Sequence, residues 1–165
     1  MGSVYLSIHP VLALKYKQEY NLNTFIETGL CLGESVLWAH SVGFENIFSI
    51  ERGDEYYELF KNTHSNIPAT IIHGDSSVEL AKLLQLVTDR GLIWLDAHHA
   101  ELTPIRDEMK ALNECSVDHV VMVDDVRLFG YFPIWPSQEE VREALASGGR
   151  RVVSEIDDVF VALPV

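Results

Sequence analysis

The sequence predicts a three-layer α/β fold, in which a mostly parallel sheet carries helices on both faces and ends in an antiparallel hairpin. Two observations predict it. Short runs rich in Ile, Val, Phe and Leu alternate along the chain with stretches that carry helix start signals. These runs are apolar on both faces, as strands buried in a parallel sheet are. Alternation of this kind implies right-handed crossovers, and 165 residues suit one domain.

Seven strands are expected. Five of them alternate with helices, and they lie at residues 24–27, 46–51, 69–73, 92–96 and 119–124. The last two, at 151–156 and 158–163, follow one another closely enough to pair as an antiparallel hairpin.

Three helices carry recognisable start signals. Ser76 with Glu79 and Ser137 with Glu140 have the spacing of a capping box, in which a hydroxyl and a carboxylate satisfy the first backbone N–H groups. The Thr-Pro pair at 103–104 is typical of an N-cap followed by the first helical residue.

The helix expected after residues 103–104 has one apolar face, because Ile105, Met109 and Leu112 recur at helical spacing. This face is expected to pack on the sheet.

Charge and composition exclude several classes of function. Twelve Lys and Arg against 25 Asp and Glu give a net charge of −13, and that field repels nucleic acids and anionic membranes. The only adjacent basic pair is Arg150-Arg151, and no apolar run is long enough to span a bilayer. Cys31 and Cys115 cannot form a disulfide framework. Without a secretion signal, a cytoplasmic protein that binds neither nucleic acid nor membrane is expected.

Acidic residues gather where the predicted strands end. In a parallel α/β sheet, ligands bind at the carboxyl ends of the strands, near the point where the strand order reverses. A stable fold does not require carboxylates at that edge, so their concentration there is the strongest functional signal in the chain. The residues concerned are Glu27, Glu51, Asp75, Asp96, Asp124 and Asp125.

The segment after the first strand, residues 27–33, reads ETGLCLG. Gly29 and Gly33 allow a sharp turn and a close approach of a ligand to the backbone. An acid precedes them, however, and Glu27 disfavours a pyrophosphate and favours a ligand with an ammonium group. Taken alone, two glycines in such a turn are also consistent with a purely structural role.

The second and third strands end in residues that suit a nucleoside. Glu51 can accept both hydroxyls of a ribose, and Asp75 can accept from an exocyclic amine while Ser76 caps the helix beneath it. The alternatives are an exposed acid at a strand end for Glu51 and a plain turn and cap for Asp75 and Ser76. Together with Glu27 these positions predict a pocket for an adenosine with a cationic tail.

On these residues the sequence resembles the class I S-adenosylmethionine-dependent methyltransferases, and WLDAH at 94–98 and VDD at 123–125 resemble a small bacterial subgroup. The resemblance covers nearly the whole chain and implies a Rossmann-like methyltransferase fold with a seven-stranded sheet. Cys31 departs from it, because the common motif has glycine there, and no lid or substrate domain is added. S-adenosylmethionine would be held by Glu27, Thr28, Gly29, Gly33, Glu51, Asp75, Ser76 and Asp96.

A second group, expected to converge beyond the fourth and fifth strands, comprises Asp96, His98, His99, Asp124 and Asp125. Crowded carboxylates repel one another unless a cation or a proton intervenes. Oxygen ligands suit Mg²⁺, and a histidine shifts the preference towards transition metals. The pattern is similar to the macrocin-type metal-dependent O-methyltransferases.

That resemblance implies that Asp96, Asp124 and Asp125 hold Mg²⁺ or another divalent cation, with His98 or a carboxylate taking the acceptor's proton. Two alternatives remain open. Asp125 can instead pair with Arg127, and Asp124 can cap the loop that follows it.

The segment 127–136 is too apolar for a plain surface connection. It either walls the acceptor pocket, covers the edge of the sheet or forms a contact in a homodimer.

The function predicted from these features is transfer of a methyl group from S-adenosylmethionine to an oxygen of a small polar acceptor, with or without a divalent metal. Asp96, His98 and Asp125 are the expected catalytic residues. The alternative is a non-catalytic or partner-dependent module on the same fold. A third interpretation, a metal-dependent hydrolase of the arginase type, lacks the acid that its motif needs where Ala100 stands.

Overall fold

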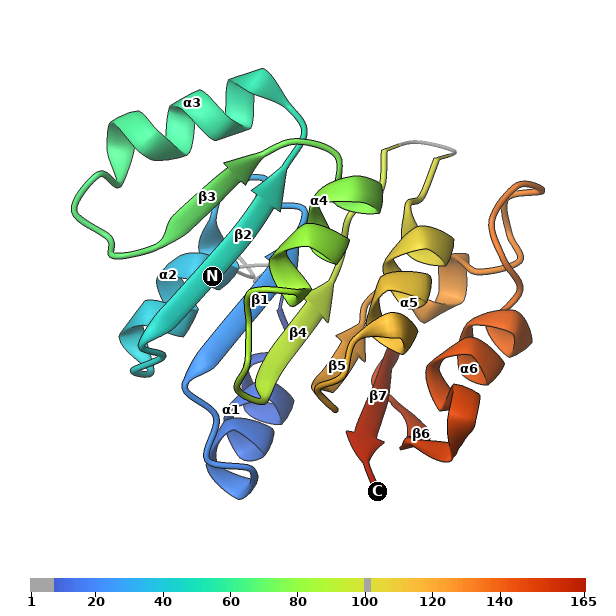
Figure 1. Ribbon diagram of the computed structural model, residues 1–165. Coiled ribbons are helices and arrows are strands. Elements are labelled where there is room, and N and C mark those ends of the chain that lie inside the picture. The colour runs from blue at the N-terminus through green and yellow to red at the C-terminus, as the bar shows by residue number, and fades with distance from the viewer. Residues whose placement is uncertain (1–7, 100–101) are drawn as a thin grey trace.

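In the computed structural model, which describes residues 8–99 and 102–165, seven strands form one sheet (Figure 1). Their order in the sheet is β3-β2-β1-β4-β5-β7-β6. Strands β1 to β5 pair in parallel, whereas β7 is antiparallel to both β5 and β6. The predicted parallel sheet and terminal hairpin are thus confirmed. The strands are β1 (Thr24–Thr28), β2 (Asn46–Glu51), β3 (Thr70–His73), β4 (Gly91–Leu95), β5 (Val120–Val123), β6 (Arg151–Ile156) and β7 (Val159–Pro164).

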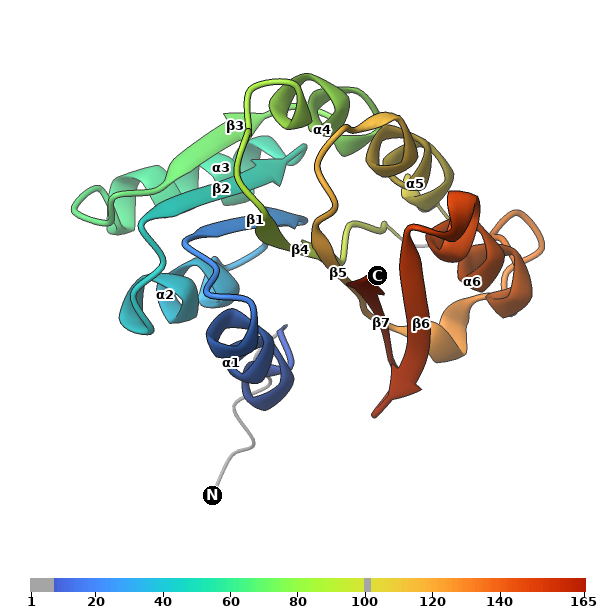
Figure 2. The same cartoon turned by 60° about the horizontal axis from the view of Figure 1, so that its bottom comes forward.

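Helices cover both faces of the sheet, which makes three layers (Figure 2). One face packs against α1 (Pro10–Glu19), α2 (Glu34–Ser41) and α3 (Asp54–Thr63). The other face packs against α4 (Ser76–Leu84), α5 (Ile105–Glu114) and α6 (Gln138–Ala146). Across residues 8–99 and 102–165, every helix is too short or too polar to cross a bilayer.

Each strand feeds both cores because successive side chains point to opposite faces of a sheet. In β1, Phe25 belongs to the core under α1–α3, and Ile26 belongs to the core under α4–α6. Strands with two buried faces read as continuous apolar runs, and this is why the five parallel strands could be found from the sequence.

The predicted helix start is confirmed for α6. For α4 and α5 the residue that caps the helix differs from the predicted one. At α6, Ser137 Oγ accepts from the Glu140 N–H at 3.1 Å and Glu140 Oε2 accepts from the Ser137 N–H at 2.6 Å, which is the predicted capping box. The capping box predicted at Ser76 is wrong. Asp75 is the N-cap of α4 instead, and its Oδ1 accepts from the Ser77 N–H at 3.0 Å. A carboxylate one residue earlier takes the role, and Ser76 becomes the first helical residue.

At α5 the Thr103 hydroxyl oxygen accepts from the Ile105 N–H at 3.3 Å. The helix begins at Ile105, so Pro104 precedes it and does not occupy its first turn as predicted.

The amino end of the sheet is held by two arginines that precede and begin β6. Arg151 donates to Asn113 Oδ1 at 3.1 Å and to the Leu112 carbonyl at 3.2 Å, and Arg150 donates to the Cys115 carbonyl at 2.8 Å. These bonds satisfy groups at the C-terminal end of α5, which no longer have partners within the helix. They tie the hairpin to α5.

A buried histidine completes this end of the molecule. His119 Nδ1 accepts from the Gly91 N–H at 3.0 Å, and burial lowers the pKa of His119 to about 4. The ring is therefore neutral at physiological pH and joins the start of β4 to the segment before β5.

Candidate functional site

The strand order reverses between β1 and β4, and the site lies at their carboxyl ends. Two glycines shape the turn after β1. A Cβ on Gly29, whose φ is +87°, would lie 3.1 Å from both Ala97 Cα and Asp96 O. A Cβ on Gly33, whose φ is +78°, would overlap the Phe60 ring at 2.2 Å. Only glycine allows the turn to pack this closely against β4 and α3.

Cys31 stands where the related motif has its middle glycine, and the structure shows what that departure involves. Its φ of +48° lies in the left-handed region that side chains rarely adopt. The Cys31 side chain is exposed, and its backbone N–H donates to Glu51 Oε2 at 3.0 Å. The turn therefore holds a cysteine in a backbone conformation that favours glycine.

Glu51 joins the first turn to the second. Its other oxygen, Oε1, accepts from the Gly53 N–H at 2.6 Å, and the side chain is buried. Each carboxylate oxygen can accept more than one hydrogen bond, so these contacts leave room for a ribose hydroxyl. The alternative of an exposed strand-end acid is wrong, and binding of a ribose stays a prediction.

Asp75 is placed at the rim beside Arg52, with 3.5 Å between Arg52 Nη1 and Asp75 Oδ2. Hydrogen bonding from Ser77 lowers the pKa of Asp75, which is ionised at neutral pH. Asp75 therefore has the alternative role predicted for it, because it lies in a turn and caps α4. The side chain is 43% exposed, which leaves it accessible to an amine donor, as predicted for adenine.

Glu27 lies beneath the turn and has no exposed surface. The Ser49 hydroxyl donates to Glu27 Oε1 at 2.7 Å, whereas Oε2 accepts no hydrogen bond from the described residues. Burial raises the pKa of Glu27 to about 8, so its carboxyl is mostly protonated at neutral pH. The structure places it as a support of the turn, and its predicted contact with a cationic ligand is untested.

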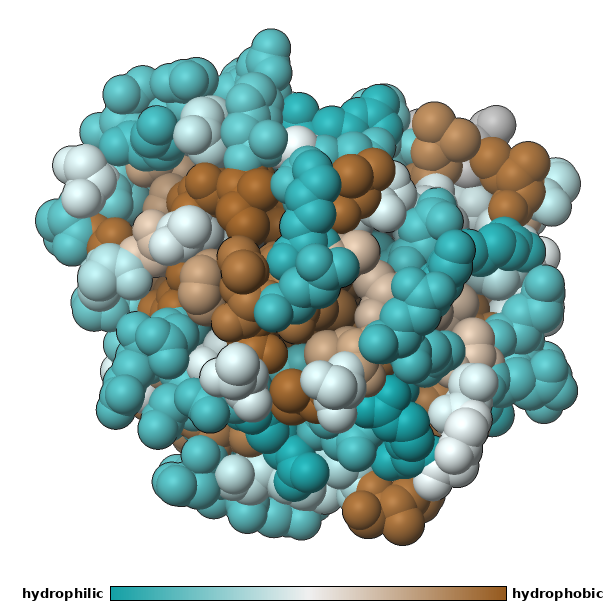
Figure 3. Space-filling model, viewed as in Figure 1, coloured by the Kyte–Doolittle hydropathy of each residue, from teal (hydrophilic) through white to brown (hydrophobic). Residues whose placement is uncertain are grey.

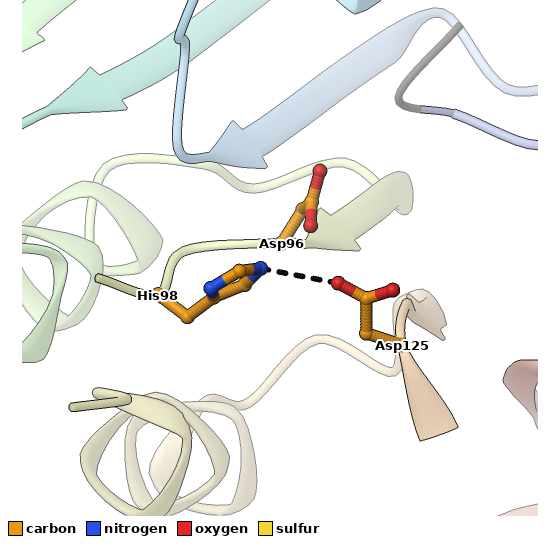
Figure 4. A group of neighbouring side chains, drawn as sticks. All are labelled: Asp96, His98 and Asp125. Carbon is orange, nitrogen blue, oxygen red and sulfur yellow. Dashed lines mark hydrogen bonds and ion pairs between the residues drawn. The ribbon is translucent and has the colours of Figure 1, made fainter. Parts of the chain in front are cut away.

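Three side chains beyond β4 and β5 form a compact cluster (Figure 4). Asp96, His98 and Asp125 each offer one ligand atom, and these atoms lie within 4.8 Å of one another. His98 Nε2 and Asp125 Oδ2 are 3.1 Å apart and share a hydrogen bond. Asp125 holds this position with a φ of +56°, an unusual backbone for a non-glycine residue that is often found at functional sites.

The pKa values in and beside this cluster diverge. Burial and the charges of Asp124 and Asp125 raise the pKa of Asp96 to about 8, and burial raises that of Asp124 to about 6. The hydrogen bond from His98 lowers the pKa of Asp125. One acid is thus protonated beside an ionised one at neutral pH, which is the electrostatic pattern of a site that holds a proton or a cation.

The other predicted members of the cluster lie differently. His99 pairs through its backbone with Leu102, and its exposed side chain does not join the ligand group. Asp124 accepts from the Asp125 backbone N–H, so it caps the loop, and it lines the same hollow as Asp96. Whether it ligates a metal stays a prediction.

Arg127 also takes part at this edge of the site. Its guanidinium lies 2.8 Å from Asp125 Oδ1 and also pairs with Asp158 in the hairpin turn. The pairing of Asp125 with Arg127 is therefore present, and it coexists with the contact to His98.

The aromatic segment 127–136 walls a narrow hollow beside the cluster. The hollow is tight, with room for little more than a water molecule, and Phe129 and Trp135 line it together with Asp96 and Asp125. The Trp135 ring lies 5.6 Å from the His98 ring. Of the three roles predicted for this segment, walling the site is the one that the packing of Phe129 and Trp135 favours.

The loops that follow β4 and β5 carry exposed apolar side chains. Figure 3 shows apolar side chains gathered at the upper right, over the loops that follow β4 and β5. The large exposed side chains in these loops are Leu102, Tyr131 and Ile134.

Glu108 of α5 also lines the hollow and was not predicted. It is only 1% exposed, and burial raises its pKa to about 7. A signal for it exists in the sequence, because position 108 falls on the face formed by Ile105, Met109 and Leu112. A carboxylate on the apolar face of a helix is rarely buried without a purpose.

No family model matches the sequence, and no curated protein sequence is similar to it. Solved structures are similar in fold. The O-methyltransferase TomG from Streptomyces achromogenes, in complex with S-adenosylmethionine, matches 94% of this chain over 79% of its own, with 17% identity and a TM-score of 0.72. The methyltransferase PaMTH1 of Podospora anserina, bound to S-adenosylhomocysteine, matches 100% of this chain over 80% of its own, with 15% identity and a TM-score of 0.68.

A further structure was solved with a metal. The methyltransferase MycE of the mycinamycin biosynthetic pathway, in complex with Mg and S-adenosylhomocysteine, matches 99% of this chain with 12% identity and a TM-score of 0.70. This chain spans half of the MycE chain. At these identities the likenesses establish the fold, which is the Rossmann-like methyltransferase fold predicted from the sequence.

Proposed function

We propose that this chain is an S-adenosylmethionine-dependent methyltransferase that methylates an oxygen of a small acceptor with the help of a divalent cation. One observation carries the proposal. The glycine turn held by Glu51 and the cluster of Asp96, His98 and Asp125 meet at the switch point of the sheet, where Gly29 packs directly on the backbone of Asp96 and Ala97. The similar structures that contain S-adenosylmethionine or S-adenosylhomocysteine support the same conclusion.

The cofactor residues proposed are those of the three turns. The backbone around Gly29 and Gly33 would face the methionine part, Glu51 the ribose, and Asp75 with Ser76 the adenine. Thr28 and Asp96 border the turn because the Asp96 N–H donates to the Thr28 carbonyl at 3.2 Å. When bound, S-adenosylmethionine supplies a methyl group on a sulfonium, which is a good leaving group, so positioning accounts for much of the catalysis.

A divalent cation suits the residues beyond β4 and β5. Burial raises the pKa values of Asp96 and Asp124, and the neighbouring carboxylates raise them further. A bound cation would favour the ionised form of both groups. Asp96, Asp125 and either Asp124 or His98 would hold it. When bound, such an ion lowers the pKa of a coordinated hydroxyl group.

The side chains have separate roles in the proton transfer. His98 lies at the exposed edge of the cluster, where an acceptor hydroxyl can reach its ring. Its Nε2 shares a hydrogen bond with Asp125 Oδ2, which orients the ring and stabilises the imidazolium form after the proton is taken. Trp135 restricts the position of the ring from the other side.

The exposed apolar side chains of the loops that follow β4 and β5 narrow the class of acceptor that the sequence predicts. Leu102, Tyr131 and Ile134 would contact the body of the acceptor, while its hydroxyl reaches His98. A small molecule that combines a hydroxyl with an apolar framework matches this arrangement better than a wholly polar one.

Calorimetric titration tests the proposal. Purified protein is titrated with S-adenosylmethionine and with S-adenosylhomocysteine, in Mg²⁺, in Mn²⁺ and in EDTA. Micromolar binding in all three conditions supports the cofactor site, and a hydroxylated acceptor that binds only with metal present supports the cation site. Absence of cofactor binding in every condition would contradict the function.

A further inference from the structure

We propose that Glu108 is a positioning residue of the cofactor site, which holds the end of β1 and the start of α4 in register from a buried position on α5. The inference rests on the proposed binding of S-adenosylmethionine. It names a residue outside the sequence motifs and outside the cluster of Asp96, His98 and Asp125.

The contacts of Glu108 join three elements. The Ser76 hydroxyl donates to its carboxyl group, and the Thr28 hydroxyl lies beside it. Thr28 precedes Gly29 in the first turn, and Ser76 follows Asp75 in the third. Glu108 therefore touches both of the turns that are proposed to enclose the two ends of the cofactor.

The burial of this carboxyl points to a role beyond packing. Glu108 is 1% exposed, and its Oε1 has no hydrogen-bond partner among residues 8–99 and 102–165. The Thr28 hydroxyl oxygen is likewise buried and unpaired within the described part of the chain. Buried polar groups without partners are rare, and the exceptions concentrate where a protein binds or reacts.

Helix packing does not require an acid at this position. Glu108 lies on the buried face of α5 beside Ile105, Met109 and Leu112, which all belong to the core under α4–α6. A leucine or methionine there would complete the apolar face. The acid instead reaches the hollow that Asp96 and Asp124 also line, so it lies between the cofactor turns and the reacting groups.

The protonation of Glu108 is consistent with this role. Burial raises its pKa to about 7, so a large fraction of the molecules carry a neutral carboxyl at neutral pH. A neutral carboxyl offers one O–H donor and one acceptor oxygen. It can thus accept from the Ser76 hydroxyl and still offer a donor to a further group.

The test compares three variants by calorimetric titration with S-adenosylhomocysteine. Glu108→Leu removes the polar contact and should weaken binding by about 10-fold or more, the loss expected for a buried hydrogen bond. Glu108→Gln keeps a donor and an acceptor and should recover most of the affinity. Asp107→Asn alters an exposed acid in the same turn of α5 and should bind as the unmodified protein does.

A double-mutant cycle keeps the test decisive even where Glu108→Leu does not fold. Ser76→Ala is combined with Glu108→Met, a second variant that removes the polar contact and has a more flexible side chain, and each protein is also checked by urea unfolding. If Glu108 acts through Ser76, the two effects on the S-adenosylhomocysteine dissociation constant should be clearly non-additive. A purely structural role would change the unfolding midpoint and leave the affinity of the folded protein unchanged.

The experiment distinguishes a failure of the role proposed for Glu108 from a failure of the proposed function. If the unmodified protein binds S-adenosylhomocysteine and the Glu108 variants bind it equally well, or the cycle is additive, the role of Glu108 is wrong and the proposed function stands. If the unmodified protein binds neither S-adenosylmethionine nor S-adenosylhomocysteine, both are overturned.

Discussion

Buried polar groups are mostly hydrogen-bonded at the amino end of the sheet, whereas several lack a partner at its carboxyl end. At the amino end, Arg150, Arg151 and His119 give hydrogen bonds to, or take them from, groups that would otherwise be unpaired. At the carboxyl end of the sheet, the unpaired buried atoms include Glu27 Oε2, Thr28 Oγ1 and Glu108 Oε1. At the amino end of the sheet, Arg151 Nε is the one such atom among the residues that the structure describes.

This difference separates stability from function within one domain. An unpaired buried polar group costs about 1–3 kcal/mol, so a region optimised for stability alone would not retain several of them. The carboxyl end also contains acids whose pKa values are raised to about 8, about 7 and about 6. The comparison indicates that the amino end holds the fold together and that the carboxyl end is organised around a ligand.

The largest expected effect is that of Asp96→Asn. The substitution removes a central ligand of the cluster and should reduce methyl transfer and Mn²⁺ affinity by about 100-fold or more, the scale of losing a positioned catalytic group. Urea unfolding should show no loss of stability, because the amide removes a carboxyl that is costly to ionise in the fold. If Asp96→Asn retained activity or lost much stability, the carboxyl end of the sheet could not be called functional in contrast to a structural amino end. Asp107→Asn is the matched control.

Arg151→Met tests the other end. It leaves the Leu112 carbonyl and Asn113 Oδ1 without their donor, and unfolding should become easier by about 3 kcal/mol, as for other broken buried polar networks. The affinity for S-adenosylhomocysteine should stay unchanged at a temperature where the variant is folded. Lys110→Met, at an exposed position with a weak ion pair, should change stability by less than about 0.5 kcal/mol. A loss of affinity in Arg151→Met would show that the two ends are coupled.

His98→Asn and Asp124→Asn sharpen the description of the cluster. If His98 acts as the base, its substitution should lower kcat by about 100-fold and leave Mn²⁺ affinity unchanged. Asp124→Asn should then weaken Mn²⁺ binding, which can be measured by electron paramagnetic resonance. The opposite pattern would make His98 the third ligand, and a site with one imidazole should favour Mn²⁺ or Co²⁺ over Mg²⁺.

The smallest effect concerns pH. Glu27, Asp96, Glu108 and Asp124 have folded pKa values above their ordinary ones, so the folded chain binds more protons than the unfolded chain between about pH 4 and pH 8. Stability should therefore fall as pH rises through this window, seen as a decrease in Tm between pH 6 and pH 8. Mn²⁺ should reduce the decrease, and a Tm that rises over this range would contradict the assignment.

The sequence allowed most of the fold to be predicted, because buried parallel strands leave apolar runs of a recognisable length. Strands 46–51 and 151–156 were predicted at their observed ends. The N-terminus of α4 was wrong by one residue, because Asp75 and Ser76 are both good caps and the sequence does not show which of them leaves the helix. The order β5-β7-β6 was not assigned, since strand neighbours depend on contacts between distant segments.

The site was only partly predictable for the same reason. Glu51 ends β2 and Asp96 directly follows β4, so their position at the carboxyl edge could be inferred. Glu108 could not be placed, because its partners Thr28 and Ser76 come from other segments and only folding brings the three together. His98 was named as the catalytic histidine, but the pattern gave no physical reason to prefer it to His99, since loop geometry determines which ring turns towards Asp125.

The central claim is that a nucleoside ligand binds the carboxyl end of the sheet and that the amino end remains a structural support. Amide hydrogen exchange with and without S-adenosylhomocysteine tests it most directly. The account predicts slower exchange at residues 27–33, 51–53, 74–77 and 96–99, with no change at 113–119 and 150–153. Protection confined to the amino end, or binding that leaves the three turns unprotected, would contradict it.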